Sequence, residues 1–421
     1  MLRFINSLVD IIIFIYAKPQ LLFKAVRILK RDGFFSFANS FSRTLKIKKQ
    51  RLKSLDQFQS SFNLLQSESV FIFHHSIGGG ADKYIKQRIK NELQDSFNVF
   101  LIQYIPALDY YSLEFLNNEN LNFKFNIIDD LYSIFEGINL KKIIINELIT
   151  YDNLFDVLDS INVLKTKTNA VIEVDIHDYF VICPNFILLN NEKSFCGICK
   201  NPLNTDCLKK NKYLRGEYKK YRITEWRQKW GEFLKSVDSI TCFSKSSKDF
   251  LLYTYPSIDN KKILVKPHTV DYIRKASVKN KIDVFNIGVI GDITEEKGAS
   301  IIKEMAEIIQ RKNYPIILTV IGRISGNVKK QGIIIKGEYS VDSLVDIVEE
   351  AMIDIIFIPS IWPETFSYTT EEAMMMELPV AVFNIGAPAE RVMRYNKGLV
   401  IEKIEAEYAL DMFLSFFNFS G

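Results

Sequence analysis

The chain has 421 residues, of which 48% are hydrophobic and 25% are charged. This composition is typical of a folded soluble protein, and the length predicts two domains of about 150–200 residues each. The net charge of +4 is uneven, because residues 1–53 contain twelve Lys or Arg against two Asp, which leaves the remainder acidic. No zinc-finger, RRM or helix-turn-helix pattern accompanies this basic segment, so we expect no nucleic-acid partner.

The basic segment, residues 1–53, carries apolar side chains at helical spacing. Its longest apolar run, Leu8–Ala17, is interrupted by Asp10 and is shorter than the roughly 20 residues that span a bilayer. No small-residue cleavage site follows it, so we expect a cytoplasmic protein without a secretory signal. The segment either contacts an anionic membrane surface, on the inner face of the cell membrane, or packs on the protein's own surface.

After this segment, short β-rich apolar runs alternate with helical patterns, which is typical of parallel sheets covered by helices. The first series of predicted strands is Val70–Phe73, Val99–Tyr104, Lys142–Ile145, Val171–Ile176, Ser239–Phe243 and Ile263–Lys266. The second series is Asn286–Ile290, Ile316–Ile321, Ile333–Lys336, Ile353–Ile358, Val380–Phe383 and Leu399–Ile401. The polar stretch Asp271–Asp283 separates the two series as a linker.

We therefore predict an α/β protein with two Rossmann-like, doubly wound parallel-sheet domains that bind ligands at the carboxyl ends of their strands. The predicted division is residues 1–55 for the basic amphipathic segment, 56–272 for the first domain, 273–400 for the second, and 401–421 for a C-terminal helix. A return of this helix to the first domain is one arrangement that we consider.

A glycine-rich loop, His74–Asp82, follows the first predicted strand. Its consecutive glycines, including Gly79 and Gly80, allow the backbone to approach a ligand closely. The loop lacks the spacing of a dinucleotide-binding G-x-G-x-x-G motif, and the chain has no G-x4-G-K-[ST] phosphate loop. The glycines alone therefore predict a ligand contact without identifying the ligand.

Each of the four histidines follows a predicted strand, so we expect them to line one cleft. His177, after the strand Val171–Ile176, is the best candidate for a polar group beside a substrate, and a purely structural histidine is the alternative.

Four cysteines, Cys183, Cys196, Cys199 and Cys207, lie close together in the sequence. The Cys196-x2-Cys199 spacing suits a structural zinc site, and reduced, unligated thiols are the alternative in the cytoplasm.

In the second series, the strand that ends at Ile290 is followed by Gly-Asp-Ile-Thr-Glu-Glu-Lys297-Gly298. Lys297 can place a point charge on a diphosphate. Arg323, after the next strand, either neutralises the same group or lines a base pocket, and we favour the base pocket.

The segment Pro359–Val380 is the most informative part of the chain. Glu364 lies in its loop and Glu372 on the helix that follows. Ser367, Tyr368 and Thr369 occupy the first turn, whose free N–H groups and positive dipole end favour phosphate. A diphosphate there leaves a sugar near Glu364 and a ribose near Glu372, each carboxylate accepting hydroxyl hydrogen bonds. Two solvated glutamates are the alternative, which does not explain the whole segment.

This segment resembles the E-x7-E signature of glycosyltransferase family 4, retaining enzymes of the GT-B fold, in which two Rossmann-like domains face a central cleft. The match continues through the turn Gly386–Arg391. The resemblance implies that Lys297 binds the donor phosphates, with Asp292 where the family often has arginine. It further implies that Tyr339 contacts the base through its backbone and that His177 touches the transferred sugar.

The resemblance implies a retaining hexosyltransferase that moves a sugar from a nucleotide-diphosphate donor to a glycan or lipid-linked acceptor, with the acceptor on the first domain. A His-Asp-aromatic stretch followed by Cys-Pro resembles a bacterial subset in polysaccharide and lipopolysaccharide synthesis. No D-x-D triplet is present, so we expect no catalytic metal. A nucleotide-sugar epimerase or hydrolase of the same fold and a non-catalytic membrane-associated scaffold remain alternatives.

The predicted catalytic residues are Glu364, His177 and Lys297. The predicted donor-binding residues are Gly79, Gly80, Lys297, Arg323, Tyr339, Phe366, Ser367, Tyr368, Thr369 and Glu372.

Overall fold

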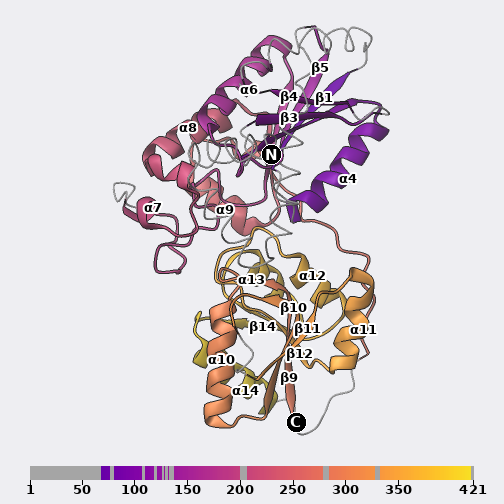
Figure 1. Ribbon diagram of the computed structural model, residues 1–421, viewed down its shortest axis with the longest axis vertical. Helices are drawn as coiled ribbons and strands as arrows, with labels where there is room; N and C mark the ends of the chain where they lie inside the picture. Colours follow the sequence, from indigo (N-terminus) through magenta and orange to yellow (C-terminus); the bar gives the residue numbers. More distant parts are fainter. Residues whose placement is uncertain are drawn as a thin grey trace, which may run out of the picture.

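The structure is a computed structural model that describes residues 68–75, 80–106, 110–117, 121–125, 128, 131, 137–199, 206–277, 284–327 and 332–418. The basic segment and its predicted membrane contact lie outside the described residues. Two domains follow one another along the long axis of the molecule, the first in indigo to rose and the second in orange to yellow (Figure 1).

The first domain is built on an eight-stranded sheet of order β4-β3-β2-β1-β5-β6-β7-β8. Its strands are β1 Ser69–His74, β2 Asn98–Ile105, β3 Tyr110–Phe115, β4 Leu121–Phe125, β5 Leu140–Ile145, β6 Val171–Ile176, β7 Ser239–Cys242 and β8 Ile263–Val265. The six strands expected from the sequence are confirmed, and neighbours among them pair in parallel.

Strands β3 and β4 were not expected from the sequence. They extend the sheet beyond β2 in antiparallel register, with Phe100 opposite Phe115 and Tyr111 opposite Phe125. Side chains of β3 alternate between half-buried and buried positions. Because only one face of β3 is buried, its sequence lacks the continuous apolar run that identifies the central parallel strands.

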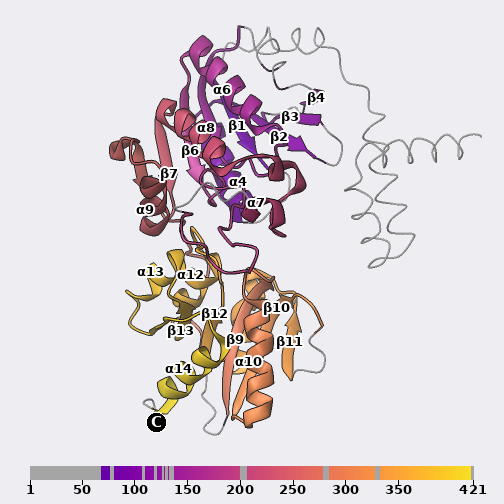
Figure 2. The same ribbon diagram turned by 90° about the vertical axis from the view of Figure 1, so that its left-hand side faces the viewer.

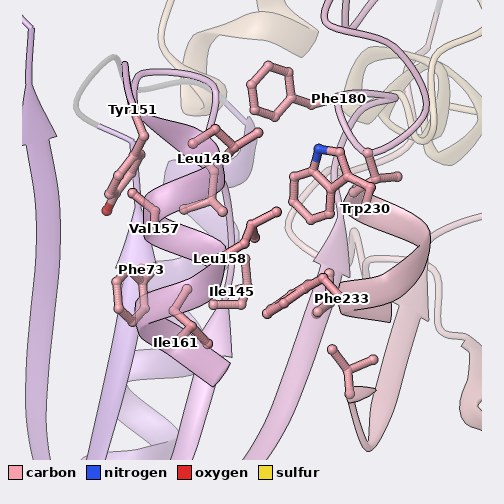
Figure 3. Close-up of a cluster of buried hydrophobic side chains, with 14 of the residues drawn as sticks. Phe73, Ile145, Leu148, Tyr151, Val157, Leu158, Ile161, Phe180, Trp230 and Phe233 are labelled. Carbon is pink, nitrogen blue, oxygen red and sulfur yellow. The ribbon is translucent and has the colours of Figure 1, made fainter. Parts of the chain in front are cut away.

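The main helices of the first domain are α4 Gly80–Gln94, α6 Leu154–Thr168, α8 Ile223–Ser236 and α9 Lys245–Thr254. Shorter turns are α7 Asp206–Lys210, η1 Gly216–Lys220 and η2 Asn260–Lys262. Leu158 and Ile161 of α6 point toward Trp230 and Phe233 of α8 across the core (Figure 3). These apolar faces fix the helices against the sheet and leave the strand ends to carry polar residues.

The second domain has a six-stranded parallel sheet of order β11-β10-β9-β12-β13-β14. Its strands are β9 Phe285–Ile293, β10 Ile316–Ile324, β11 Ile333–Gly337, β12 Ile355–Ile358, β13 Val380–Phe383 and β14 Gly398–Ile401, which confirms the second predicted series. This is the doubly wound order in which the strand sequence reverses between the first and fourth strands, here β9 and β12. Ligands of such sheets bind at the carboxyl ends of that strand pair.

The helices of the second domain are α10 Ala299–Lys312, α11 Val341–Ala351, α12 Tyr368–Met375, α13 Gly386–Val392 and α14 Ala406–Asn418. Helix α10 buries one apolar face, which includes Ile302, Met305 and Ile309. Helix α14 lies beside α10 in the core of this domain (Figure 2), so the described C-terminal helix does not return to the first domain. No helix among the described residues is long and apolar enough to cross a membrane.

The two domains contact each other through hydrogen bonds from loops at their facing ends. Thr365 of the second domain donates its hydroxyl hydrogen to the backbone oxygen of His177, at 2.6 Å. The Glu390 carboxylate accepts from the backbone N–H groups of Lys245 and Ser246. The carboxyl ends of the two sheets therefore share one region.

Candidate active site

The loops that follow β9 and β12 are in direct contact. The N–H of Ile361 donates to the backbone oxygen of Glu296, at 3.1 Å. Gly298 has a φ of +88°, and a Cβ built on it would lie 2.1 Å from the Pro359 oxygen. Only glycine permits this approach, since any side chain would collide with a backbone carbonyl. The contact fixes the backbone next to Lys297 against the loop that leads to Glu364.

Glu364 is buried in the loop before α12. Burial raises the pKa of its carboxyl, while the Lys297 charge and hydrogen bonds to Ser360 and Ser367 oppose that rise. Gly386, at a φ of +65°, lets α13 pack against the Glu364 backbone, because an added Cβ would lie 2.6 Å from the Pro363 backbone. The structure therefore brings the predicted Glu364 and Lys297 into one electrostatically coupled site.

Helix α12 begins beside this pair. Ser367 is its N-cap and accepts from the N–H of Thr370, at 3.4 Å. Tyr368 and Thr369 form the first turn, and a Cβ on Gly291 would lie 3.8 Å from Thr369 Cγ2. The N–H groups of this turn lack intrahelical partners, and the positive end of the helix dipole favours an anion.

Glu372 lies one turn further along α12 and is buried among three tyrosines. Its Oε1 accepts from the hydroxyl of Tyr272, at 2.6 Å. Burial raises the pKa values of Tyr339 and Tyr368 to about 12, and the nearby Glu372 charge adds to both shifts. The predicted Tyr339, Tyr368 and Glu372 thus come together, joined by Tyr272 from the linker.

The first domain contributes neutral imidazoles to the same region. His177 Nε2 is 3.0 Å from Asn146 Oδ1, and the Asn146 amide also bonds His74. Burial lowers the pKa of His177 well below its usual range, and His268, His74 and His75 lower it further. The expected clustering of all four histidines is therefore seen.

His268 connects this cluster to the second domain. Its ring stacks on Phe243 at 4.0 Å and on Tyr368 at 5.2 Å between centroids. Phe366, another predicted donor-binding residue, meets the same ring edge-on at 4.7 Å. Burial lowers the pKa of His268 to about 4, with a smaller contribution from Lys83. At neutral pH His268 is therefore an uncharged aromatic surface.

Arg323 is held at the edge of the second sheet by two carboxylates. It lies directly opposite Asp292 in the β9–β10 register and is 3.4 Å from that carboxylate. A second ion pair joins it to Glu338 at 3.1 Å, and the Arg323 side chain is 64% exposed. Asp292, which stands where the family often has arginine, and Arg323, for which we favoured the base pocket, therefore pair with each other.

Of the two predicted loop glycines, Gly79 lies outside the described residues. Gly80 begins α4, and a Cβ built on it would lie 3.3 Å from the Tyr368 ring. Since Gly80 belongs to the first domain and Tyr368 to the second, α4 and α12 begin next to each other.

In the described part of the chain, the cysteines are not arranged as a metal site. Among the described residues, no three His, Cys, Asp or Glu side chains are placed to hold a metal ion. The Cys196 thiol instead donates to the backbone oxygens of Leu188 and Gly197. Burial raises the pKa values of Cys183 to about 12 and of Cys196 to about 11, which keeps them as thiols. The geometry therefore favours reduced thiols over the zinc hypothesis.

Several residues of the site were not identified from the sequence: Lys83, Asn146, Tyr272 and Thr365. Asn146 follows β5 directly, so the rule that polar residues at strand ends meet could have found it. Lys83 stands in the first turn after the glycine-rich loop, a position that also carries a signal. No sequence signal identifies Tyr272, because its role in the site depends on how the linker folds back.

Comparisons with known proteins bear on the family and the fold. Residues 273–416 match the family described as glycosyl transferases group 1. This match covers the second domain. Curated protein sequences give no match.

Solved structures extend the likeness to both domains. Sucrose-phosphate synthase from Thermosynechococcus elongatus aligns with a TM-score of 0.56 at 12% identity, over 83% of this chain and 90% of that one. HepE of Anabaena, in complex with UDP-glucose, aligns at 0.50 and 12%, over 84% and 91%. A glycosyltransferase from Rickettsia africae aligns at 0.50 and 16%, over 85% and 90%. At these identities the likeness shows the fold, and the predicted GT-B architecture is confirmed.

Proposed function

We propose that this protein is a retaining glycosyltransferase that uses a nucleotide-diphosphate sugar as donor. The observation that carries the proposal is that Lys297 and buried Glu364 lie on two loops in direct contact, beside the start of α12. An ammonium, a carboxylate and free helix N–H groups are what a sugar diphosphate requires of its site. UDP-glucose, with which the Anabaena protein forms its complex, is a donor of this class.

The proposed roles follow from the chemistry of each group. The diphosphate rests against the N–H groups of Tyr368 and Thr369, and Lys297 stabilises the charge that develops on it as the sugar leaves. Glu364 accepts hydrogen bonds from sugar hydroxyls, Glu372 accepts them from the ribose, and the base lies near Tyr339. We propose that no divalent metal is required, because these fixed donors act on the leaving group directly.

Retention of configuration is proposed from the family resemblance, with departure and attack on the same face of the sugar. Among the described residues of the site, we assign none as a covalent nucleophile in that scheme. His177, as a neutral imidazole held by Asn146, can exchange hydrogen bonds with the transferred sugar without altering the charge of the site. The acceptor is proposed to be a glycan or lipid-linked glycan of the cell surface, with residues 1–53 directing the protein to an anionic membrane.

The first experiment is a thermal-shift screen of UDP, GDP, dTDP and CDP, followed by transfer assays with the sugar nucleotides of the best base. Glu364→Gln should reduce turnover by roughly ten- to a hundredfold, because a charge-assisted hydrogen bond contributes about 1.5–3 kcal/mol. Glu405→Gln, an exposed carboxylate before α14, is the matched control and should keep full activity. Unchanged turnover in Glu364→Gln would remove the assignment.

A further inference from the structure

Lys83 belongs to α4 of the first domain, yet its ammonium reaches the linker and the second domain. Its Nζ donates to the Tyr272 hydroxyl at 2.5 Å. The same atom lies 3.8 Å from the centroid of the Tyr272 ring and 4.8 Å from that of Tyr368. Lys83 is therefore held by one phenol oxygen and two ring faces at the start of α12.

Among the described residues, no carboxylate forms an ion pair with Lys83. Lys86, one turn further along α4, pairs with Asp82 at 2.8 Å, whereas Lys83 makes no ion pair with any described residue. Its charge contributes to the low pKa of His268, so it acts within the region where the domains meet. An unbalanced ammonium beside rings and neutral imidazoles is a place for an anion.

Two helix starts face this ammonium. Gly80 begins α4 and Tyr368 begins α12, and a Cβ on Gly80 would come within 3.3 Å of the Tyr368 ring. Both helices direct unpaired N–H groups and the positive ends of their dipoles toward the same place. The anion that fits would thus touch both domains at once.

Two arginines of the second domain near this region already have carboxylate partners among the described residues. Arg323 pairs with Asp292 and Glu338, and Arg391 pairs with Glu371. In the proposed function this leaves Lys297 as the second domain's cation for a doubly charged diphosphate. A further cation has to come from elsewhere in the chain, and Lys83 is placed to supply it.

We infer, on the basis of the proposed function, that Lys83 is a second diphosphate-binding residue contributed by the first domain, and that Tyr272 occupies Glu372 and Lys83 until the donor displaces it. The Tyr272 hydroxyl donates to Glu372 at 2.6 Å, which is the bond the ribose hydroxyls would replace. Once Tyr272 leaves, Lys83 loses its hydrogen-bond acceptor and turns to the diphosphate. Donor binding thereby replaces the bonds of Glu372 and Lys83 to Tyr272 with bonds to the ribose and the diphosphate.

Calorimetric titrations can separate the two parts of this inference. The ligands are the nucleoside diphosphate that gives the largest thermal shift among UDP, GDP, dTDP and CDP, and its own nucleoside, which lacks the diphosphate. Lys83→Met should weaken the diphosphate by about tenfold and leave the nucleoside unchanged, since a hydrogen bond to a charged group is lost. Lys86→Met, on the same helix, should leave both affinities unchanged.

Tyr272→Phe should strengthen the binding of both ligands, because the hydroxyl that competes for Glu372 is gone while the ring remains. Unchanged or weakened binding of the nucleoside in this variant would refute the exchange. A Lys83→Met variant with wild-type affinity for the diphosphate, or with parallel losses for both ligands, would refute the contact with the diphosphate.

Lys297→Ala distinguishes failure of this inference from failure of the proposed function. Loss of diphosphate affinity in Lys297→Ala together with wild-type affinity in Lys83→Met would overturn only the role of Lys83. If Lys297→Ala also binds the diphosphate normally, the donor site itself is misplaced and both proposals fall.

Discussion

Glu390 of α13 caps a helix that belongs to the other domain. Its two carboxylate oxygens accept from the backbone N–H groups of Lys245 at 3.2 Å and Ser246 at 2.8 Å, the first two residues of α9. Ser244 accepts from the next N–H of the helix. The first turn of α9 is therefore satisfied only while the domains are docked, and we predict that Glu390→Gln weakens the docking.

The size of the effect follows from the bonds that change. Glutamine keeps one acceptor oxygen but removes the charge and the second acceptor. Hydrogen bonds to a charged group contribute about 1.5–3 kcal/mol when buried, and partial exposure of this pair reduces the loss to about 1–2 kcal/mol. A loss of that size lowers the ratio of docked to open molecules by roughly 5- to 30-fold.

Hydrogen exchange at the start of α9 is a direct measurement of this change. The amides of Lys245 and Ser246 should exchange faster in Glu390→Gln by that factor, and the radius of gyration in solution should rise. Glu402→Gln is the control, because Glu402 accepts from Asn384 within the second domain. Equal exchange at the start of α9 in the wild type and Glu390→Gln would refute the proposed interdomain cap.

Three further predictions concern stability. Gly298→Ala should cost at least about 2 kcal/mol in urea unfolding, because the residue has a φ of +88° and its Cβ would lie 2.1 Å from the Pro359 oxygen; a cost below about 0.5 kcal/mol would contradict this reading. Leu158→Ala should cost about 2–5 kcal/mol by the same assay, since the side chain is fully buried between α6 and α8, and an unchanged midpoint would contradict it. Burial raises the pKa of Asp178 to about 7 and raises that of the adjacent Glu147. The folded protein thus keeps a proton that unfolded carboxyls release above about pH 4, so this contribution to stability falls as pH rises from about 4 to 7, by up to about 1.4 kcal/mol per pH unit. Asp178→Asn should make that slope shallower, with Glu147 remaining as a buried carboxyl, and equal slopes in denaturant titrations of variant and wild type across this range would show the account to be wrong.

The fold was predictable because its central strands are buried on both faces. Strand β13 is a continuous, fully buried apolar run, and the predicted bounds of both β6 and β13 agree with the observed ones. The missed strand β3 pairs antiparallel at the side of the sheet, where alternating burial gives a weaker pattern. Sequence therefore identified the doubly wound core and missed its antiparallel extension.

The site was predictable where its residues lie on loops that follow neighbouring strands. Glu364 and Lys297 follow two strands that are adjacent by topology, so the fold prediction brought them together. The contact of Lys83 with Tyr272 joins residues 189 positions apart, in elements that no strand order relates. This contact exists only because one domain is placed against the other, which no pattern in the sequence predicts.

If Lys297 and Lys83 hold one diphosphate from opposite domains, donor binding and domain docking are the same equilibrium. Linkage then requires that a variant which favours the open arrangement weakens the donor in proportion to the fall in the docked fraction, even without touching it. Glu390→Gln should therefore weaken the nucleoside diphosphate, and this effect should shrink in a Lys83→Met background, where only one domain provides a cation. Calorimetry on the double-mutant cycle measures the coupling directly. Additive effects of the two substitutions would mean that the diphosphate is held by the second domain alone.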